Sequence, residues 1–523
     1  MSPGPQPIQM ICPVCDERRF AYLFVVRGLP VVRCRGCGCM ALGALPAAAD
    51  YGNAYAGAGA VSADSETERE AASRYLDALR RRGVEAGALL VVCGAGPRVN
   101  TEVFLLQARA CGFRTELLDL SASSSQPPAV SPGSYDAAVI LHQLQTQTAP
   151  SEMLGKVYAA LRPGGPLLLT VPSLNSWPVE FFGRQWTEWR PENRLYFDCT
   201  TIQLLLLRHG FGDILVRPDR RLYTLRHIRE RASACPPTAL TRAISLAYKL
   251  LPPARRLRVR LATSGMIVTA VRAQPAARPK CSIIVAAFNE SSSFPVLMDA
   301  LLQRELPGVD REIIIVESNS TDGTREQALR YQGRPNVQLV LEGRARGKGH
   351  AIREGFRNAT GDIVLIQDAD LEYDLNDYDA LLAPILSNRA LFVLGTRHSG
   401  DWKMRRFARQ PGMSAALNFG HVFFTGLMNV LFRQNMTDPF TMFKVFRRDC
   451  LFGLEFRCNR FDFDHELVIK LVRKGYVPLE IPVNYSSRSF REGKKVRLFR
   501  DPFTWVWVNL RLRVTRVLPK DLA

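Results

Sequence analysis

Three carboxylates occupy alternate positions in the segment IQDADLEYD at residues 366–374: Asp368, Asp370 and Glu372. The segment starts at the end of an apolar run, residues 363–366, that is typical of a buried strand. Alternate side chains of an extended chain point to the same side, so the three carboxylates could bind one cation. Because a hard divalent cation prefers oxygen ligands, the spacing predicts a site for such a cation. The simpler alternative is a surface turn, in which Asp-x-Asp is also common.

The elements that would position these acids begin at Cys281, where strand-like and helix-like segments start to alternate. The strand-like segments end in CSIIVAAFNE, REIIIVESNSTDGT and DIVLIQDADLEYD. Such alternation predicts a mostly parallel sheet, in which ligands bind beyond the carboxyl ends of the strands. Further polar residues follow predicted strand ends at Asn289, Glu290, Glu317 and Asp322. We therefore expect acids from several strands to converge on one edge of the sheet.

Five short motifs occur in this part of the chain in the order AAFNE, VESNSTDGT, GKGHAIREGF, QDADLEYD and GTR. In this order the segment 279–500 resembles family 2 glycosyltransferases of the GT-A fold. It is most similar to the dolichyl-phosphate mannose synthase branch and its bacterial polyprenyl-phosphate relatives. The resemblance implies a metal-dependent, inverting transferase that takes a hexose from a nucleotide-diphosphate sugar. The implied acceptor is a polyprenyl phosphate or a hydroxyl of a glycan or metabolite.

The resemblance also implies roles for individual residues. The implied donor-binding residues are Phe288, Asn289, Glu290, Glu317, Asp322, Gly347, Lys348, Gly349 and Arg397. Asp368, Asp370 and Glu372 would hold Mg²⁺ or Mn²⁺ on the diphosphate. Asp438 and Asp464 are the candidate catalytic bases if the acceptor is a hydroxyl. A lipid phosphate arrives ionised, and both aspartates could then be structural.

Basic residues are concentrated at the C-terminal end of this segment and beyond it. The resemblance implies a loop here that closes over donor or acceptor phosphate, with Arg488, Arg491, Lys494 and Lys495 as clamp residues and Arg488 and Lys494 preferred. The predicted last helix combines Trp505 and Trp507 with arginines, a composition that suits a bilayer interface. The alternative is a terminal helix that packs on the transferase domain.

The N-terminal cysteines form two Cys-x-x-Cys knuckles, CPVC and CRGC, separated by a hairpin-like segment. Their four thiolates, from Cys12, Cys15, Cys34 and Cys37, can complete a tetrahedral zinc shell. Four thiolates leave no open coordination position, so this zinc is expected to be structural.

In the segment GALLVVCGAGPRV a strand-like run is followed by a Gly-rich turn with Gly94 and Gly96. A later strand-like run ends at Asp119. With the cysteine knuckles in front, residues 60–273 resemble class I S-adenosylmethionine-dependent methyltransferases. Gly94, Gly96 and Asp119 would be the cofactor-binding residues. Leu90 replaces the acid that begins the usual loop motif, and the segment after Asp119 is short. Two alternatives follow: a degenerate scaffold, or a methyltransferase that acts on a glycosylated substrate.

The composition limits the remaining possibilities. The chain has 523 residues, with 69 Lys and Arg against 49 Asp and Glu. The net charge of +20 suits phosphorylated ligands, anionic lipid or nucleic acid. Nucleic acid is not expected as a partner, because basic residues near the knuckles are not interleaved with exposed aromatics. No apolar run reaches the ~20 residues of a membrane helix, so we expect a cytoplasmic protein, with peripheral contact at the inner face of the plasma membrane as an option.

These observations predict an α/β multidomain chain. Its expected parts are a zinc ribbon at 1–45, a Rossmann-like methyltransferase domain at 46–273, a linker at 274–280, a GT-A (Rossmann-like) glycosyltransferase domain at 281–500 and a basic amphipathic helix at 501–523. The basic segment 238–261 is expected to form a helical insertion on the methyltransferase-like domain.

Overall fold

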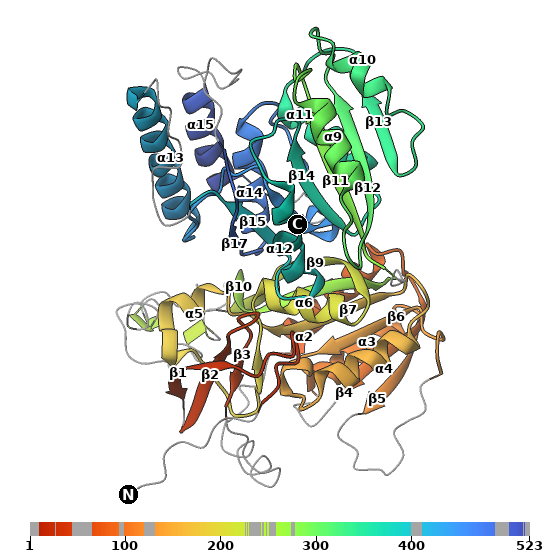
Figure 1. The fold of residues 1–523 in the computed structure, drawn as a ribbon. Coiled ribbons are helices and arrows are strands. Elements are labelled where there is room, and N and C mark those ends of the chain that lie inside the picture. Colours follow the sequence, from red (N-terminus) through yellow and green to blue (C-terminus); the bar gives the residue numbers. More distant parts are fainter. Residues whose placement is uncertain are drawn as a thin grey trace, which may run out of the picture. The chain divides into compact units, whose positions relative to one another are not determined.

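The computed structural model divides into two compact units, Met1–Pro275 and Ala276–Ala523 (Figure 1). It describes residues 10–26, 28–43, 65–93, 99–119, 131–224, 258–273, 278–398, 411–486 and 501–515, with scattered residues between 226 and 249 and residue 517. Both units combine helices with sheets, which confirms the predicted α/β class. The finer domain bounds remain predictions.

The first unit starts with a small antiparallel sheet in the order β1-β2-β3-β8. Its strands are β1 (Phe20–Val26), β2 (Leu29–Cys34), β3 (Met40–Leu42) and β8 (Leu195–Tyr196). The fourth strand comes from a distant part of the sequence, since Met40 pairs with Tyr196. Val31 and Leu42 also pack with Trp186, Trp189 and Tyr196 in one apolar cluster. The cysteine-containing hairpin is therefore anchored to the rest of its unit.

The second sheet of this unit has the order β5-β4-β6-β7-β10-β9. Its strands are β4 (Gly87–Cys93), β5 (Phe113–Asp119), β6 (Ala137–Leu141), β7 (Pro166–Pro172), β9 (Phe211–Thr224) and β10 (Arg258–Arg272). β5, β4, β6 and β7 are parallel, whereas β10 runs antiparallel to both of its neighbours. The helices of the unit are α2 (Ser65–Arg80), α3 (Val99–Ala110), η2 (Leu144–Thr146), α4 (Pro150–Ala160), α5 (Trp177–Phe182), η3 (Gly183–Gln185) and α6 (Cys199–Arg208).

One prediction about this unit is wrong in part. Residues 258–261, expected at the end of a helical insertion, belong to β10 and pair with β9 from Thr224 to Arg221. Arg258 and Arg260 alternate along the strand and form ion pairs with Glu66 and Glu70 of α2. The period of two in RVRL therefore reflects a strand rather than a helix.

The second unit contains a seven-stranded sheet in the order β13-β12-β11-β14-β16-β15-β17. Its strands are β11 (Lys280–Ala287), β12 (Asp310–Glu317), β13 (Val337–Leu341), β14 (Ile363–Asp368), β15 (Phe392–Thr396), β16 (Lys444–Arg447) and β17 (Leu479–Pro482). β13, β12, β11 and β14 are parallel, and β16 is antiparallel to β14 and β15. The helices are α9 (Phe294–Gln303), α10 (Thr324–Leu329), α11 (Lys348–Asn358), η5 (Leu375–Asp377), α12 (Tyr378–Leu386), α13 (Pro411–Phe432), η6 (Arg448–Leu451), α14 (Asp462–Arg473) and α15 (Asp501–Val514).

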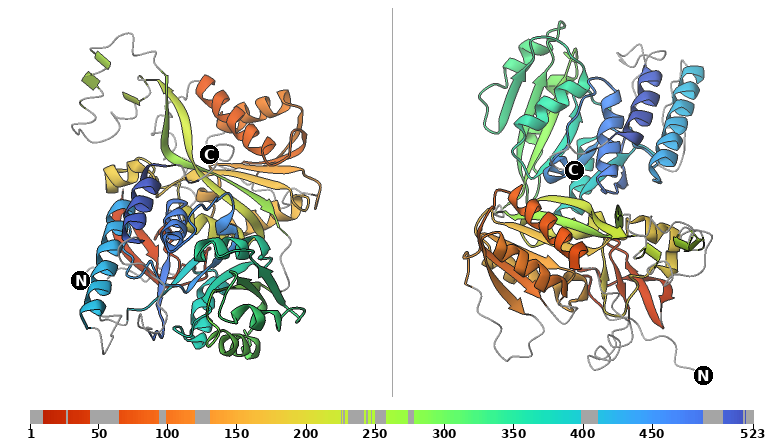
Figure 2. Two further views of the ribbon diagram at one scale, coloured as in Figure 1. Left: turned by 90° about the horizontal axis from the view of Figure 1, so that it is seen from above. Right: turned by 180° about the vertical axis from the view of Figure 1, so that it is seen from behind.

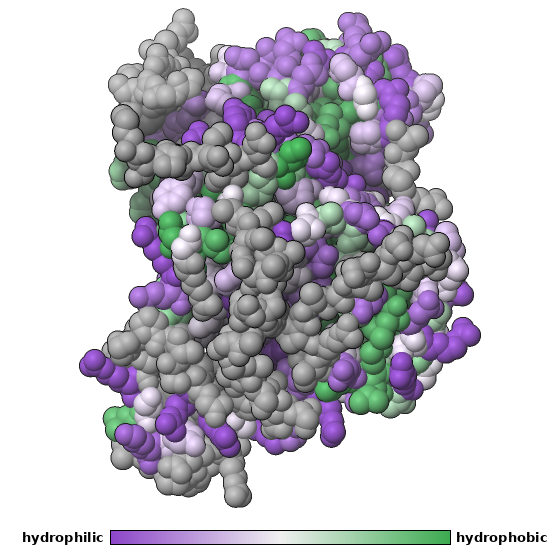
Figure 3. All heavy atoms as spheres, turned by 90° about the horizontal axis from the view of Figure 1, so that it is seen from below, coloured by the Kyte–Doolittle hydropathy of each residue, from purple (hydrophilic) through white to green (hydrophobic). Residues whose placement is uncertain are grey.

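Helices α13, α14 and α15 pack together beside this sheet, and α13 and α15 lie side by side in both Figure 1 and Figure 2. Among the helices that the structure describes, none combines the length and apolarity needed to cross a bilayer. On the face drawn in Figure 3, the coloured side chains are mostly hydrophilic, with small hydrophobic patches between them.

Candidate active site

The carboxyl ends of three neighbouring parallel strands meet at one edge of the second unit's sheet. The register places Ala287 opposite Glu317 and Ala286 opposite Asp368, so β11, β12 and β14 end at the same level. Antiparallel β16 brings its first residue, Lys444, to the same edge, opposite Ile366. Chain segments that follow these strand ends therefore line one rim, where ligands of parallel sheets bind.

Asp368 forms an ion pair at this rim with Lys348, the first residue of α11. The Lys348 ammonium lies 2.6 Å from Oδ1 and 2.7 Å from Oδ2 of Asp368. The glycines on either side of the lysine permit close packing at the start of α11. A Cβ on Gly349 would come within 2.5 Å of the Cβ of Phe463, at the start of α14. The Gly-Lys-Gly motif thereby fixes where the lysine enters the rim.

Several acids surround the Lys348 ammonium. Burial by itself would lower the pKa of Lys348, but the carboxylates of Asp368, Asp464 and Asp370 raise the pKa above its usual value. Lys348 therefore stays protonated, and the rim carries a permanent cation among its acids.

A divalent cation needs ligand oxygens that lie close together, so the spacing of these acids matters. Among the described residues, the four knuckle cysteines are the one group of three or more ligand side chains whose atoms all lie within 4.8 Å. Asp368, Asp370 and Glu372 do not meet this criterion, because β14 ends at Asp368 and the chain bends over residues 369–372. Glu372 Oε2 also accepts a hydrogen bond from the hydroxyl of Tyr485, at 2.8 Å.

Asp368 and Asp370 nevertheless fit a hard cation, because they are oxygen donors at the strand end and Asp368 already binds a cationic group through both oxygens. These two residues would hold Mg²⁺ or Mn²⁺. The metal role of Glu372 stays a prediction.

Glu317 is the last residue of β12, and its side chain points into the loop that follows the strand. Its carboxylate is fully buried and accepts hydrogen bonds from the amides of Ser320, at 2.6 Å, and Asn319, at 3.2 Å. Arg325 forms an ion pair with it at 3.1 Å. In this state the carboxylate shapes the loop, and its contact with the donor stays a prediction.

The loops after β11 and β12 are joined by side-chain hydrogen bonds. Asn289 Oδ1 accepts from the amide of Thr321 at 2.9 Å, and Asp322 Oδ2 accepts from the amide of Ser291 at 3.0 Å. Burial would raise the pKa of Asp322, but hydrogen bonds from Thr324 and Ser291 lower it to about 2. Phe288 is half-buried and Glu290 is buried beside this junction. The predicted donor-binding residues 288–290 and 322 thus lie together at the rim.

Arg397 and Asp438 form a buried two-point ion pair. The Nε–Oδ2 and Nη2–Oδ1 distances are both 2.7 Å, and the side chains are 6% and 0% exposed. The guanidinium also lies 5.2 Å from the centre of the Tyr485 ring. Burial would raise the pKa of Asp438, but Arg397 holds this pKa well below its usual value. Asp438 is therefore ionised and already neutralised by a fixed cation.

The other candidate base, Asp464, is also paired. Its Oδ1 accepts from the ammonium of Lys444 at 2.9 Å, and the Lys444 side chain is fully buried. Burial lowers the pKa of Lys444, although the Asp464 carboxylate acts in the opposite direction. Both predicted bases are thus held in ion pairs.

The four knuckle cysteines of the first unit come together as predicted. Cys12 Sγ lies 3.6 Å from Cys37 Sγ, and Cys15 Sγ lies 3.5 Å from Cys34 Sγ. Zinc–thiolate bonds of about 2.3 Å would place tetrahedral sulfurs roughly 3.8 Å apart. The cluster is therefore compatible with a structural zinc ion in a zinc ribbon.

Loss of a zinc ion bound by these four thiolates should destabilise the first unit. The variant Cys34→Ser is expected to lose the metal and at least about 2 kcal/mol of unfolding free energy. The reason is that the hairpin packs with Trp186, Trp189 and Tyr196. Metal analysis and thermal unfolding would measure both effects.

Cys39→Ala is the matched control, because Cys39 lies next to the second knuckle but outside the four-thiol group. It should keep one zinc per chain. Full stability of Cys34→Ser without metal would contradict a structural zinc.

Comparison with known proteins adds to this geometry. Residues 282–452 match the family model described as "Glycosyl transferase family 2", and residues 67–216 match one described as "Methyltransferase domain". The second unit contains a family 2 glycosyltransferase domain.

Three curated relatives match part of this chain. The dolichol-phosphate mannosyltransferase of Pyrococcus furiosus is 25% identical over 217 residues, which are 41% of this chain and 59% of the relative. That of Mycosarcoma maydis is 36% identical, over 24% of this chain and 47% of the relative. The human dolichyl-phosphate beta-glucosyltransferase is 28% identical, over 44% of this chain and 72% of the relative. The chain thus spans about half the length of the first two relatives.

Among solved structures, glucosyl-3-phosphoglycerate synthase from Mycobacterium tuberculosis, in complex with Mn²⁺, uridine diphosphate and phosphoglyceric acid, is 18% identical. The match covers 46% of this chain and 80% of that chain, with a TM-score of 0.32.

Some predicted residues lie outside the described part of the chain. These are the clamp residues Arg488, Arg491, Lys494 and Lys495, and the glycines Gly94 and Gly96. Asp119 is described and ends β5, as predicted from the sequence. The roles of all seven residues stay predictions.

The glycosyltransferase domain also contains site residues that sequence reasoning did not name. Lys444 is one, although a lone lysine in the apolar run TMFKVF marks it. His421 is another: its Nε2 lies 3.2 Å from Nε2 of His398 and 3.9 Å from Asp438. No local pattern in the sequence indicates the position of His421, since its neighbours come from other elements.

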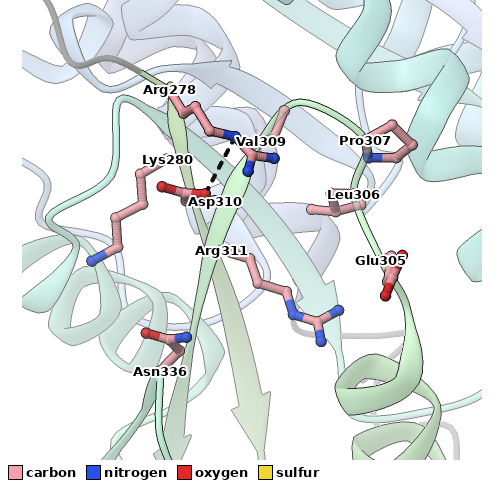
Figure 4. Close-up of a pocket in the computed structure, with 9 residues that line it drawn as sticks. All are labelled: Arg278, Lys280, Glu305, Leu306, Pro307, Val309, Asp310, Arg311 and Asn336. Carbon is pink, nitrogen blue, oxygen red and sulfur yellow. Dashed lines mark ion pairs between the residues drawn. The ribbon is translucent and has the colours of Figure 1, made fainter.

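A cavity of about 650 Å³ lies at the opposite edge of this sheet, where β11 and β12 begin (Figure 4). Arg278, Lys280 and Arg311 line it, and Arg278 pairs with Asp310 at 3.6 Å. In parallel sheets the amino ends are not the ligand-binding edge, so the rim remains the candidate active site.

Proposed function

We propose that the glycosyltransferase domain transfers a hexose, with inversion, from a nucleotide-diphosphate sugar to a polyprenyl phosphate in a reaction that requires Mg²⁺ or Mn²⁺. One observation carries the choice of acceptor: both candidate bases, Asp438 and Asp464, are held in ion pairs. A hydroxyl acceptor needs a base to remove its proton, whereas a phosphate monoester is already ionised at neutral pH. The alternative acceptor, a glycan or metabolite hydroxyl, is less compatible with these pairs.

The donor would bind along the rim with its diphosphate toward Asp368 and Asp370. Cleavage of the anomeric bond leaves negative charge on the departing diphosphate, and a bound divalent cation would neutralise part of that charge. Lys348 would supply further positive charge from the protein, whereas the charge of Arg397 is balanced by Asp438. The loops after β11 and β12 would hold the nucleoside, since their hydrogen bonds fix the shape of that end of the rim.

Apolar side chains on two neighbouring helices support a lipid acceptor. On α13 the exposed fractions of Phe419 and Val430 are 71% and 79%, and on α15 those of Phe503 and Trp507 are 78% and 64%. The exposed Arg513 lies in the last turn of α15 and would attract anionic lipid, whereas Arg511 faces Glu466. We therefore propose that this pair of helices touches a membrane surface, as peripheral contact. Trp505, in contrast, stacks on His465 and is not part of that surface.

The relatives' names support the same class of acceptor, because two are dolichol-phosphate mannosyltransferases and one is a dolichyl-phosphate beta-glucosyltransferase. The test is sugar transfer from a panel of nucleotide sugars to polyprenyl phosphate or to the matching polyprenol, both in vesicles with Mn²⁺. We expect product from the phosphate and at least about 100-fold less from the alcohol. Equal transfer to the alcohol would contradict the proposed acceptor.

A second candidate function is methyl transfer by the first unit, which the family match at residues 67–216 favours. Its sheet ends at β5, and the structure describes no strand beyond it. Asp119 ends the outermost described strand of this sheet, and no described strand lies beyond it to support the adenine side of a cofactor.

We propose that the first unit is a scaffold rather than a methyltransferase. Calorimetry with S-adenosylmethionine at millimolar concentration is expected to show no binding. Saturable binding in the micromolar range would instead support a bifunctional enzyme that methylates a glycosylated substrate.

A further inference from the structure

Lys348 lies among the acids where the proposed function places a divalent cation. Both oxygens of Asp368 contact its ammonium, at 2.6 and 2.7 Å, and each side chain is only 17% exposed. Met442 Sδ at 2.9 Å and the ring of Phe461, whose centre lies 5.8 Å away, form other walls around the ammonium. This lysine is thus enclosed by groups that favour a cation.

We infer that Lys348 is an internal counter-ion that leaves Asp368 when the metal–donor complex binds; this inference rests on the proposed function. A divalent cation that coordinates Asp368 would compete with the ammonium for the same two oxygens and would lie beside its positive charge. A metal ion that arrives alone must therefore share this carboxylate with a buried cation or displace that cation. Metal binding without donor should consequently be weak.

The donor removes this obstacle because its diphosphate brings new anionic oxygens to the rim. Lys348 is suited to change partners, since its ammonium is a compact charge on a flexible four-carbon stem. It also begins α11, where the helix N-terminus favours phosphate oxygens. The lysine can turn from Asp368 to the diphosphate, and the metal then takes its place on Asp368.

Asp464 cannot easily receive the displaced ammonium, because Lys444 already occupies its Oδ1 at 2.9 Å. Two like charges would otherwise share one carboxylate in a buried region. The exchange is therefore linked to the donor, and the metal and donor should bind cooperatively. In this account Lys348 is a positioning residue for the metal.

The test is Mn²⁺ binding, followed by electron paramagnetic resonance of the free ion, with the full chain and no nucleotide. Lys348→Gln is expected to bind Mn²⁺ at least about tenfold more tightly than the wild type, because the competing charge is gone. Adding GDP or UDP should tighten Mn²⁺ binding by the wild type at least about tenfold more than by Lys348→Gln. Lys348→Arg should retain the weak metal binding of the wild type.

Lys280→Gln is the matched control, because it removes the same charge from the amino end of β11, at the opposite edge of the sheet. It should bind Mn²⁺ as the wild type does. Equal Mn²⁺ affinity of wild type and Lys348→Gln without nucleotide would overturn the inference, whether or not sugar transfer occurs. Sugar transfer that proceeds without any divalent cation would instead overturn the metal requirement in the proposed function.

Discussion

Asp370→Asn is expected to lower the rate of sugar transfer by at least about two orders of magnitude. The substitution keeps the size of the side chain and removes one negative charge from the two residues that would hold the metal. Asp370 is 9% exposed, so water replaces the lost ligand poorly. Initial rates at saturating donor, with Mg²⁺ or Mn²⁺, would measure the effect. The melting temperature should change little, because the loss concerns the transition state.

Asp310→Asn is the matched control, because it makes the same substitution of aspartate by asparagine at another position of the same sheet. Asp310 begins β12 at the amino edge of the same sheet, and its side chain is 59% exposed. This variant should transfer sugar at the wild-type rate. Undiminished turnover of Asp370→Asn would remove Asp370 from the metal site and leave the acidic rim without its proposed role.

Asp438→Asn is expected to destabilise the second unit by roughly 3–5 kcal/mol. The substitution removes the charge that compensates the guanidinium of Arg397, which is only 6% exposed. A buried cation without its partner is costly, whereas both charges together are tolerated. Urea unfolding at pH 7 would give the difference in unfolding free energy. Sugar transfer should also fall, because Arg397 would lose its fixed position.

The pH dependence of stability provides a second readout for the same pair. Arg397 holds the pKa of Asp438 below its usual value, so the ionised carboxylate is favoured in the folded protein. The resulting stabilisation is present above about pH 4, the usual range of an aspartate, and is lost as the pH falls toward the folded-state pKa. Asp438→Asn should therefore lose less stability than the wild type on acidification below pH 4.

Asp379→Asn is the control for this experiment. Asp379 pairs with Arg304 at 2.6 Å, but its side chain is 58% exposed. An exposed pair contributes about 0–1 kcal/mol, so this variant should unfold nearly as the wild type does. If Asp438→Asn behaved in the same way, the buried pair would have no structural importance.

Local features of the sequence were sufficient to predict the rim. The apolar runs that become β11, β12 and β14 are continuous in sequence, and polar residues follow each run directly. In a parallel sheet these ends must meet, and the register does place Ala286 opposite Asp368. The cysteine knuckles could be predicted equally well, because the two ligands of each knuckle are separated by only two residues in the sequence.

The ion pairs of the rim could not be predicted in the same way. Arg397 and Asp438 are 41 residues apart, and their contact depends on how the segments after β15 and before β16 pack. Lys348 and Asp368 meet because Gly349 lets α11 approach Phe463, which no pattern near the lysine shows. The alternate spacing of Asp368, Asp370 and Glu372 also did not predict a compact group of three carboxylates, since the chain bends once β14 has ended.

The exposed apolar surface was predicted only in part. Tryptophans and arginines mark the last helix in the sequence, whereas the sequence of α13 contains neither. α13 has no charged residue over its length, and Phe423 on it is 53% exposed. Its relation to α15 is a tertiary contact between segments that are distant in sequence.

The most direct measurement is nucleoside diphosphate release from a panel of nucleotide sugars in the presence of polyprenyl phosphate vesicles. Wild type and Asp370→Asn would be compared with and without added Mg²⁺ or Mn²⁺. We expect release by the wild type from at least one donor, only with added metal, and about 100-fold less release by the variant. Metal-independent release, or equal release by both proteins, would contradict the claim that these acids hold a dication on the departing diphosphate.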